Sequence, residues 1–68
     1  MTVVVNGERR DLGPRVTVAE LVRALGRDPE RPGTAIARNG VVLPRRTWDQ
    51  THLDDGDSIE VVTAVGGG

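Results

Sequence analysis

The chain has no cysteine, lysine, phenylalanine or tyrosine, and Trp48 is its only aromatic residue. Without cysteine it has no disulfide framework, no thiolate metal site and no catalytic thiol. Without lysine it offers no side-chain amine for Schiff-base chemistry or isopeptide formation. No apolar run approaches the roughly 18 residues of a membrane span, and the first residues lack the layout of a signal peptide. We therefore expect a soluble cytoplasmic protein with no membrane partner.

The length of 68 residues allows one small domain, because such a chain buries only about 60% of the surface that its unfolded form exposes. A large enzyme with its own closed pocket is excluded. The apolar fraction is 37% and valine is its commonest residue, so we expect a small aliphatic core rich in strands. Trp48 is predicted to fill this core under the loop before the last strand. Arg45 and Arg46 are also predicted to be structural residues and not functional ones.

The net charge of −1 is distributed unevenly along the sequence. All nine basic residues are arginines and lie within residues 1–46, whereas residues 47–68 contain no basic residue. The acids of this second part are Asp49, Asp54, Asp55, Asp57 and Glu60. The arginines are dispersed and no aromatic residues alternate with them, so the stacking surface of a nucleic-acid-binding protein is missing. We expect no nucleic-acid partner.

Five short segments have the β-branched or alternating character of strands. They span residues 2–6, 8–12, 34–38, 41–43 and 58–62. Asn6-Gly7 and Asn39-Gly40 separate the first and second pairs of these segments. Asn-Gly is typical of type I′ hairpin turns because both central residues take positive φ. The sequence therefore predicts two antiparallel hairpins, and an Asp-rich turn at residues 54–57 leads into the last strand.

One helix is predicted between the two hairpins. Thr17 and Glu20 have the spacing of a capping box, and Gly26 is placed to end the helix in a left-handed conformation. A single apolar stripe follows the cap, formed by Val18, Leu21, Val22 and Leu25. A helix of about nine residues is too short to persist alone, so it must pack on the sheet. The elements predict an α+β domain of two layers, with the helix on one face of the sheet.

The side chains do not form a familiar active site. His52 is the only histidine and Ser58 the only serine, and neither has partners visible in the sequence. The acids at residues 54–57 lack the distal Glu of an EF-hand loop, so turn chemistry explains them better than a metal site. No glycine-rich segment has P-loop spacing. We expect no metal site and no cofactor bound by the chain itself.

The C-terminal glycines are the most informative part of the sequence. Gly66, Gly67 and Gly68 lack Cβ atoms, so their backbone can lie close to the walls of another protein. Their one chemical handle is the α-carboxylate of Gly68. A carboxylate must be activated before acyl chemistry, and adenylation with ATP followed by attack of sulfide would give a thiocarboxylate. A frayed end or an engineered scar is the alternative explanation.

The whole chain resembles the ThiS-type sulfur carriers of the thiamine thiazole pathway, which belong to the ubiquitin-like β-grasp group. The order and spacing of several segments carry the resemblance. They are Val5-Asn6-Gly7, Thr17-Val18-Ala19-Glu20-Leu21-Val22, Ala35-Ile36-Ala37-Arg38-Asn39-Gly40, Val42-Leu43-Pro44-Arg45, Trp48, Asp55-Gly56-Asp57, Ile59-Glu60-Val61-Val62, and Ala64-Val65 before the final glycines. The terminal Gly-Gly of that family maps onto Gly67 and Gly68, which leaves Gly66 as a linker.

The resemblance implies a ubiquitin-like β-grasp fold: a mixed sheet of four to five strands with one helix packed on one face. It also implies that the first and last strands are parallel central neighbours. The domain is expected to span residues 1–63, and residues 64–68 are expected to form a flexible tail. Val4, Val62 and Ala64 fall on the strand phase opposite the expected core, and they are candidates for an exposed partner-docking patch.

The implied function is that of a protein co-substrate and not of an enzyme. A ThiF-type adenylating enzyme would use ATP to activate the Gly68 carboxylate, and a cysteine desulfurase or another donor would supply sulfur. Thiazole synthase would then receive the sulfur. The acids near the C-terminus are predicted to steer the tail toward a basic rim on the activating enzyme.

Three alternatives remain at the level of sequence. Carriers for molybdopterin, cysteine or natural-product synthesis share the Gly-Gly end and the acyl chemistry. A ubiquitin-like modifier would use the same activated end. A non-catalytic β-grasp interaction module would need a binding surface but no free terminal carboxylate.

Overall fold

The computed structural model describes residues 1–64. Its elements in chain order are β1 (Thr2–Val5), β2 (Glu8–Asp11), α1 (Val18–Ala24), β3 (Thr34–Arg38), β4 (Val41–Leu43), the short 3₁₀ helix η1 (Arg45–Thr47) and β5 (Ser58–Thr63). The predicted positions of all five strands and of the helix are confirmed to within one or two residues. The predicted flexible tail spans residues 64–68. Its first residue, Ala64, is described and donates its N–H to the Gly33 carbonyl, and residues 65–68 lie outside the described part.

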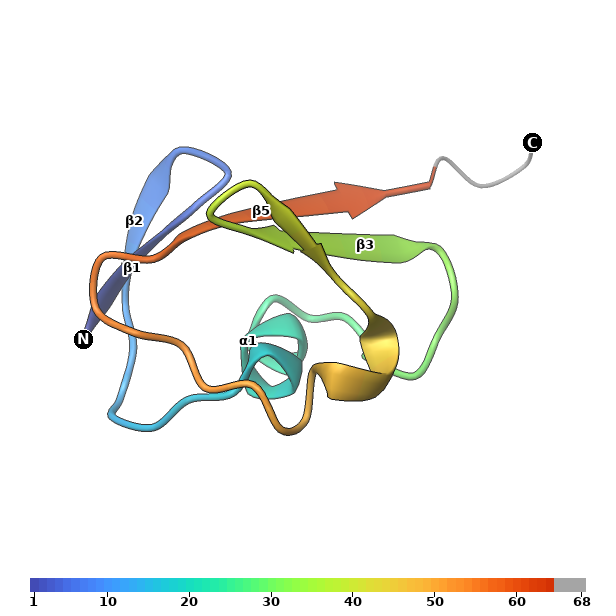
Figure 1. Cartoon of the computed structure of the whole chain (residues 1–68), viewed down its shortest axis with the longest axis horizontal. Helices are drawn as coiled ribbons and strands as arrows, with labels where there is room; N and C mark the ends of the chain where they lie inside the picture. The colour runs from blue at the N-terminus through green and yellow to red at the C-terminus, as the bar shows by residue number, and fades with distance from the viewer. Residues whose placement is uncertain (65–68) are drawn as a thin grey trace.

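The strands form one five-stranded mixed sheet in the order β2-β1-β5-β3-β4. β5 lies at its centre, parallel to β1 and antiparallel to β3, while the β1–β2 and β3–β4 pairs are antiparallel hairpins. Figure 1 shows α1 and η1 together on one side of this sheet. The α+β architecture and the parallel pairing of the first and last strands, which the resemblance implied, are both confirmed.

The two hairpins have the predicted turn geometry. Asn6 and Gly7 have φ values of 50° and 83°, and Asn39 and Gly40 have φ values of 50° and 85°. Positive φ at both central residues is the signature of a type I′ turn, whose twist matches that of the flanking strands. These turns fix the strand registers, with Val5 opposite Glu8 and Arg38 opposite Val41.

The predicted capping box begins α1. The Thr17 hydroxyl accepts the Glu20 N–H at 3.1 Å, and the Glu20 carboxylate accepts the Thr17 N–H at 3.1 Å. The helix has seven residues and not the nine expected, because Leu25 already leaves the helical conformation as the C-cap. Gly26 follows with φ of 82°, as predicted for a helix that ends in a left-handed residue.

The core lies between α1 and the inner face of the sheet. Its buried apolar residues are Val3, Val5, Val18, Ala19, Leu21, Val22, Ile36, Trp48, Leu53 and Ile59. The predicted role of Trp48 is confirmed, since it is 2% exposed and its Nε1–H donates to the Leu43 carbonyl at 3.0 Å. Within residues 1–64, no helix is long and apolar enough to cross a membrane.

The helical turn η1, which follows Pro44 directly, was not predicted from the sequence. Proline fixes φ near the helical value and is favourable at the start of a helical turn, but a single turn has no apolar periodicity to reveal it. The Thr47 N–H and hydroxyl both donate to the Pro44 carbonyl, at 2.9 and 2.7 Å. This turn places the Trp48 ring under the sheet.

Candidate functional site

The site predicted from the sequence centres on Gly68, which with Gly66 and Gly67 lies outside the described residues. The structure shows how the chain approaches them. β5 runs through the middle of the sheet, and at its end Thr63 lies opposite Thr34 of β3. The next residue is also held, because the Ala64 N–H donates to the Gly33 carbonyl at 2.6 Å. The chain therefore remains fixed to the domain as far as Ala64.

An apolar face covers the outer side of the sheet, opposite the helix. We define it by six residues: Val4, Ala35, Ala37, Val42, Val62 and Ala64. Val62 pairs with Ala35, and Ala37 pairs with Val42, so these four side chains share one face. Val62 is 61% exposed and Val42 is 70% exposed. This face has no covering element within residues 1–64.

The three candidate docking residues, Val4, Val62 and Ala64, do not form one continuous patch. Val4 is half-buried and lies beside Ser58 at the start of β5, whereas Val62 lies four residues further along the strand. At about 3.3 Å per residue this separates Val4 from Val62 by about 13 Å, and Glu60 stands on the same face between them. The candidate docking patch is therefore centred on β5, on its neighbour β3 and on β4 at the edge of the sheet.

Sequence reasoning missed three residues of the apolar face: Ala35, Ala37 and Val42. A signal for two of them was present. A two-residue turn at Asn39-Gly40 forces Arg38 opposite Val41, and so Ala37 opposite Val42. The pairing of Ala35 with Val62 had no local signal, because it depends on which strand occupies the centre of the sheet.

The Asp-rich turn before β5 is held by a hydrogen-bonded network. Arg38 donates from Nε to Asp57 and from Nη2 to Asp54, both at 2.8 Å. Asp57 also accepts the Asn39 side-chain amide at 3.0 Å and the Asp54 N–H at 2.8 Å. Asp55 accepts the Thr2 N–H at 2.7 Å. These bonds support the interpretation of these acids as a turn, and no cluster suited to a metal ion occurs in the described part of the chain.

Burial and hydrogen bonding act in opposite directions on Asp57, which is 6% exposed. Burial disfavours its charged form, but hydrogen bonds from the Asp54 N–H and the Asn39 amide, and the charge of Arg38, outweigh burial. Together they hold the pKa of Asp57 below its ordinary value. A depressed pKa means that the charged carboxylate stabilises the fold at neutral pH and that this stabilisation is lost as the pH falls through the folded-state pKa.

Three of the acids predicted to steer the tail lie away from the end of β5, whereas Glu60 lies within the strand. Asp54, Asp55 and Asp57 precede the strand, and Figure 1 shows their turn, coloured orange, at the end of the sheet opposite to Thr63. Asp57 and Ala64 flank the six residues of β5 and are therefore seven steps apart, about 23 Å at the usual rise per residue. Two of the three carboxylates are also paired with Arg38. The steering role stays a prediction, and Asp54, Asp55 and Asp57 are close to Ala64 in sequence but not in the fold.

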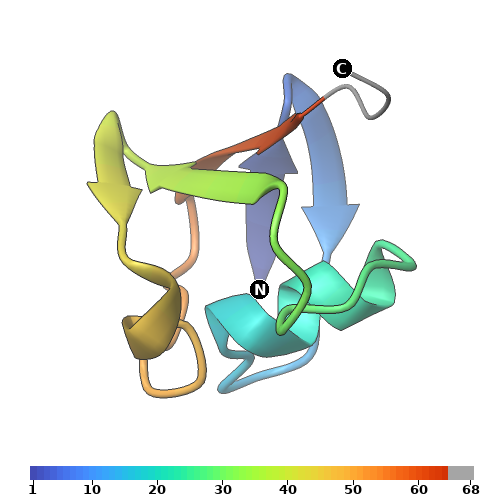
Figure 2. The same ribbon diagram turned by 90° about the vertical axis from the view of Figure 1, so that its right-hand side faces the viewer.

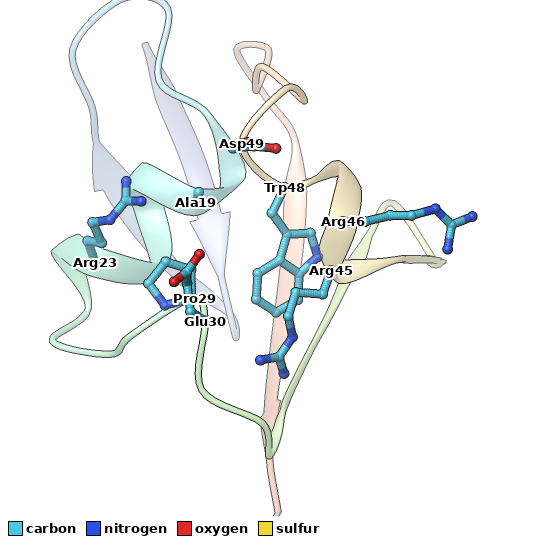
Figure 3. Close-up of a pocket in the computed structure, with 8 residues that line it drawn as sticks. All are labelled: Ala19, Arg23, Pro29, Glu30, Arg45, Arg46, Trp48 and Asp49. Carbon is cyan, nitrogen blue, oxygen red and sulfur yellow. The ribbon is translucent and has the colours of Figure 1, made fainter.

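A groove of about 610 Å³ lies between α1, the loop after it and η1. Figure 3 shows Trp48 in this groove facing Ala19 of α1, with Arg46 pointing away from the ring. The Arg45 guanidinium lies 5.2 Å from the centre of the Trp48 ring and donates to the carbonyls of Arg31 and Thr34. Arg45 and Trp48 thus serve the structure, as predicted, whereas the exposed Arg46 does not show the structural role predicted for it. The groove lining contains no nucleophile paired with a base.

The comparisons with known proteins extend over the whole chain. The sequence model of the ThiS family matches residues 3–68. The sulfur carrier protein ThiS of Escherichia coli is 32% identical over 68 residues, which cover all of both chains. A thiazole synthase of Paramagnetospirillum magneticum is 37% identical over 68 residues, but the chain spans only 20% of that protein.

A solved structure agrees with the fold. The crystal structure of the thiamine biosynthesis protein ThiS from Geobacter metallireducens superposes with a TM-score of 0.80 at 33% identity, and the match covers all of both chains. The five-stranded mixed sheet with one helix is therefore the ThiS form of the ubiquitin-like β-grasp fold. With a family match over nearly all its residues and a full-length relative above 30% identity, the chain belongs to the ThiS family.

Proposed function

We propose that this protein is the sulfur carrier of thiamine thiazole synthesis, and that its reactive group is the α-carboxylate of Gly68. The observation that carries the proposal is the family match, which extends through the terminal glycines to residue 68. The fold supports it, because a central strand held on both sides delivers the chain to Ala64 in a fixed position.

The chemistry takes place in two steps. A carboxylate oxygen of Gly68 attacks the α-phosphorus of ATP, a new P–O bond forms, and pyrophosphate leaves with the electrons of the broken anhydride bond. Hydrosulfide then attacks the acyl carbon, a C–S bond forms and AMP leaves. With a persulfide donor the same attack gives an acyl disulfide, and a second thiol must then attack the donor's sulfur, forming a disulfide with it and releasing the thiocarboxylate. The product is a thiocarboxylate, a nucleophile that can give its sulfur to an acceptor.

Partner enzymes must supply the activation, because the side chains of residues 1–64 offer no phosphate-binding loop and no paired nucleophile and base. We assign the adenylation to a ThiF-type enzyme that binds ATP, and the sulfur supply to a cysteine desulfurase or another donor. The similarity to proteins named thiazole synthase supports that enzyme as the acceptor. The carrier is then a co-substrate of these enzymes, and we propose a cytoplasmic location, which the use of ATP supports.

The apolar face is the proposed docking surface for these enzymes. Its centre at Val62 adjoins the end of β5, so an enzyme that covers Val62 also reaches the chain that follows Ala64. Removing exposed apolar side chains of this kind from water makes the free energy of binding more favourable. Val4, Val62 and Ala64 therefore stay candidates for partner contact, now joined by Ala35, Ala37 and Val42.

Intact mass spectrometry tests the proposal. The purified chain is incubated with ATP and the ThiF-type enzyme of the same organism, first without sulfide and then with it. We expect an added AMP in the first sample and the replacement of one oxygen by sulfur in the second. The matched control is a chain with one residue appended to Gly68, which should gain neither mass. A wild-type chain whose mass does not change would contradict the proposal.

A further inference from the structure

A second groove lies at the end of β5, on the side of the helix. It has a volume of about 440 Å³, and its lining includes Arg27, Arg31, Thr63 and Ala64. Thr63 shares the strand phase of Ile59 and Val61, so this groove opens toward the helix layer while Val62 points to the outer side. Figure 2 shows the end of β5 beside the start of β3, with the loop from α1 rising to meet them. We call this the exit groove.

The backbone of the loop that lines the exit groove is fixed. The Arg27 N–H donates to the Val22 carbonyl, and the Arg31 N–H donates to the Asp28 carbonyl, both at 3.1 Å. The Arg31 carbonyl accepts from the Arg45 guanidinium. Arg27 and Arg31 therefore project from defined positions, although both residues are exposed.

The exit groove carries positive charge that the described chain does not neutralise. Within residues 1–64 neither Arg27 nor Arg31 forms an ion pair, whereas Arg38 at the other end of β5 pairs with two carboxylates. The one acid in the lining, Asp28, already accepts the Glu30 N–H at 2.9 Å. Two arginines against one engaged carboxylate leave a groove that favours a negatively charged partner.

We propose that the exit groove binds an acidic segment of the adenylating partner, and that this contact holds the end of β5 while Gly68 reacts; the inference rests on the function proposed above. Reach supports it, because the four residues after Ala64 span at most about 14 Å. The reacting carboxylate therefore lies within about 14 Å of Ala64, which lines the exit groove together with Arg27 and Arg31. Arginine is suited to this contact, since its guanidinium pairs with carboxylates through two parallel hydrogen bonds.

An acidic protein segment fits the exit groove better than a nucleic acid. A strand of nucleic acid needs a track of positive charge with stacking side chains, and this groove contains two arginines and no aromatic residue. Its other lining includes Pro32 and Ala64, which suit the apolar part of a peptide. The partner surface that fits the exit groove is therefore acidic, unlike the basic rim that was predicted from the acids near the C-terminus.

The test compares two charge-reversal variants in adenylation by the ThiF-type enzyme, measured as pyrophosphate release. The first variant is R27E/R31E. The matched control is R15E/R46E, which changes the net charge equally at two exposed arginines outside the exit groove. KM and kcat are measured at low salt and at high salt, and the neutral R27Q/R31Q variant is included. Circular dichroism confirms that all three variants fold.

We expect R27E/R31E to raise KM for the carrier by about tenfold at low salt, with kcat within about twofold, because a rim charge acts on association. R27Q/R31Q should fall between this variant and the wild type. The salt dependence of KM should weaken in both, since screening acts on the charges that were removed.

The possible failures are distinguishable. An unchanged KM in R27E/R31E, or an equal rise in the control, would overturn the exit groove as a docking site while the wild type is still adenylated. A loss of kcat at unchanged KM would also overturn it, because that result places the arginines in the chemical step. A wild-type chain that releases no pyrophosphate overturns the proposed function itself.

Discussion

The two ends of β5 differ in how their charged groups are used. At the start of the strand, Arg38 pairs with Asp54 and Asp57, and the nearby backbone donors are also satisfied. At the end, Arg27 and Arg31 form no ion pair within the described residues, and Ala64 is held only by its N–H bond to Gly33. The charged groups at the start of this central strand are therefore paired with one another, whereas the two arginines at its end remain available to a partner.

This difference teaches where stability and function reside. Groups paired within the fold contribute to the free energy of unfolding, because breaking them leaves a buried partner unsatisfied. Groups left unpaired contribute little to folding and remain available to a partner. We therefore expect substitutions at the start of β5 to change stability without changing adenylation of the folded chain. Substitutions beyond its end should do the reverse.

The largest expected effect is that of Gly67→Val. A branched side chain at this position would clash in a partner channel that the backbone must enter, and misplacing the reacting atom by about 1 Å can cost on the order of a hundredfold in rate. Single-turnover adenylation, measured by intact mass, should fall by at least about that factor. The free energy of unfolding, measured by thermal denaturation, should change by no more than about 0.5 kcal/mol, which is typical of surface substitutions.

If the Gly67→Val variant accepted AMP at the wild-type rate, the residues beyond the end of β5 would not have the functional role assigned to them.

Gly33→Ala is unsuitable as a control because Gly33 has φ of 103°, a conformation that strains other residues. Gly13→Ala is a better matched control, since an added Cβ meets no atom within 4 Å at that position. It should leave both adenylation and stability unchanged.

The next effect is the loss of stability in Asp57→Ala. This substitution removes a buried carboxylate that accepts three hydrogen bonds, and it leaves Arg38 Nε and the Asn39 amide without that acceptor. We expect a loss of about 2 kcal/mol in chemical denaturation. The control is Asp54→Ala, because Asp54 binds the same guanidinium but its side chain is 80% exposed against 8% for Asp57. Its loss should stay below about 1 kcal/mol.

Equal losses in the two aspartate variants would show that burial does not distinguish them. KM for adenylation should be unchanged in both when the reaction is measured below their unfolding temperatures. A raised KM in Asp57→Ala alone would place the start of β5 in the docking surface, and the separation of roles along the strand would be wrong.

Thr17→Ala should destabilise the protein by about 1 kcal/mol, since the Thr17 hydroxyl caps the first turn of α1. Thr17 lies at neither end of β5, so this variant measures how adenylation responds to lost stability alone. Glu20→Gln is the control, because glutamine can also complete a capping box, and its loss should be smaller. An unchanged midpoint in Thr17→Ala would show that the cap contributes nothing.

The smallest effect is a dependence of stability on pH that begins only in acid. The pKa of Asp57 is lowered in the folded state, so its stabilising contribution is complete above the ordinary Asp pKa of about 3.9. It is lost as the pH falls below that value through the folded-state pKa. Denaturant unfolding measured from pH 6 down to pH 3 should show the decline, and Asp57→Asn should flatten it. If stability fell equally with pH in the wild type and in Asp57→Asn, Asp57 would not be the cause of the pH dependence.

Local patterns predicted most of the fold. The Asn6-Gly7 and Asn39-Gly40 pairs predicted both turns, and the Thr17 to Glu20 spacing predicted the start of α1. These predictions succeeded because each rule acts within about four residues, where the backbone satisfies its own hydrogen bonds. The alternation of side chains also placed Val62 on the exposed face and Ile59 in the core.

Part of the candidate site could be predicted in the same way. The exposed positions of Val62 and Ala64 follow from strand phase, and the role of Gly68 follows from the family resemblance. Position along the chain was a poor guide to where the charged residues lie in the fold. Asp54 and Asp57 are near the C-terminus in sequence but belong to the start of β5, while Arg27 and Arg31 are distant in sequence and lie beside its end.

By itself, then, the sequence determined the turns, the capped helix and the strand phases. Only the tertiary structure decided that β5 occupies the centre of the sheet, that Arg38 closes the network on Asp57, and that two arginines flank Ala64. The physical reason is the range of the forces involved. Turns and caps satisfy neighbouring backbone groups, whereas strand order is set by burying the apolar faces of all five strands against one helix at once.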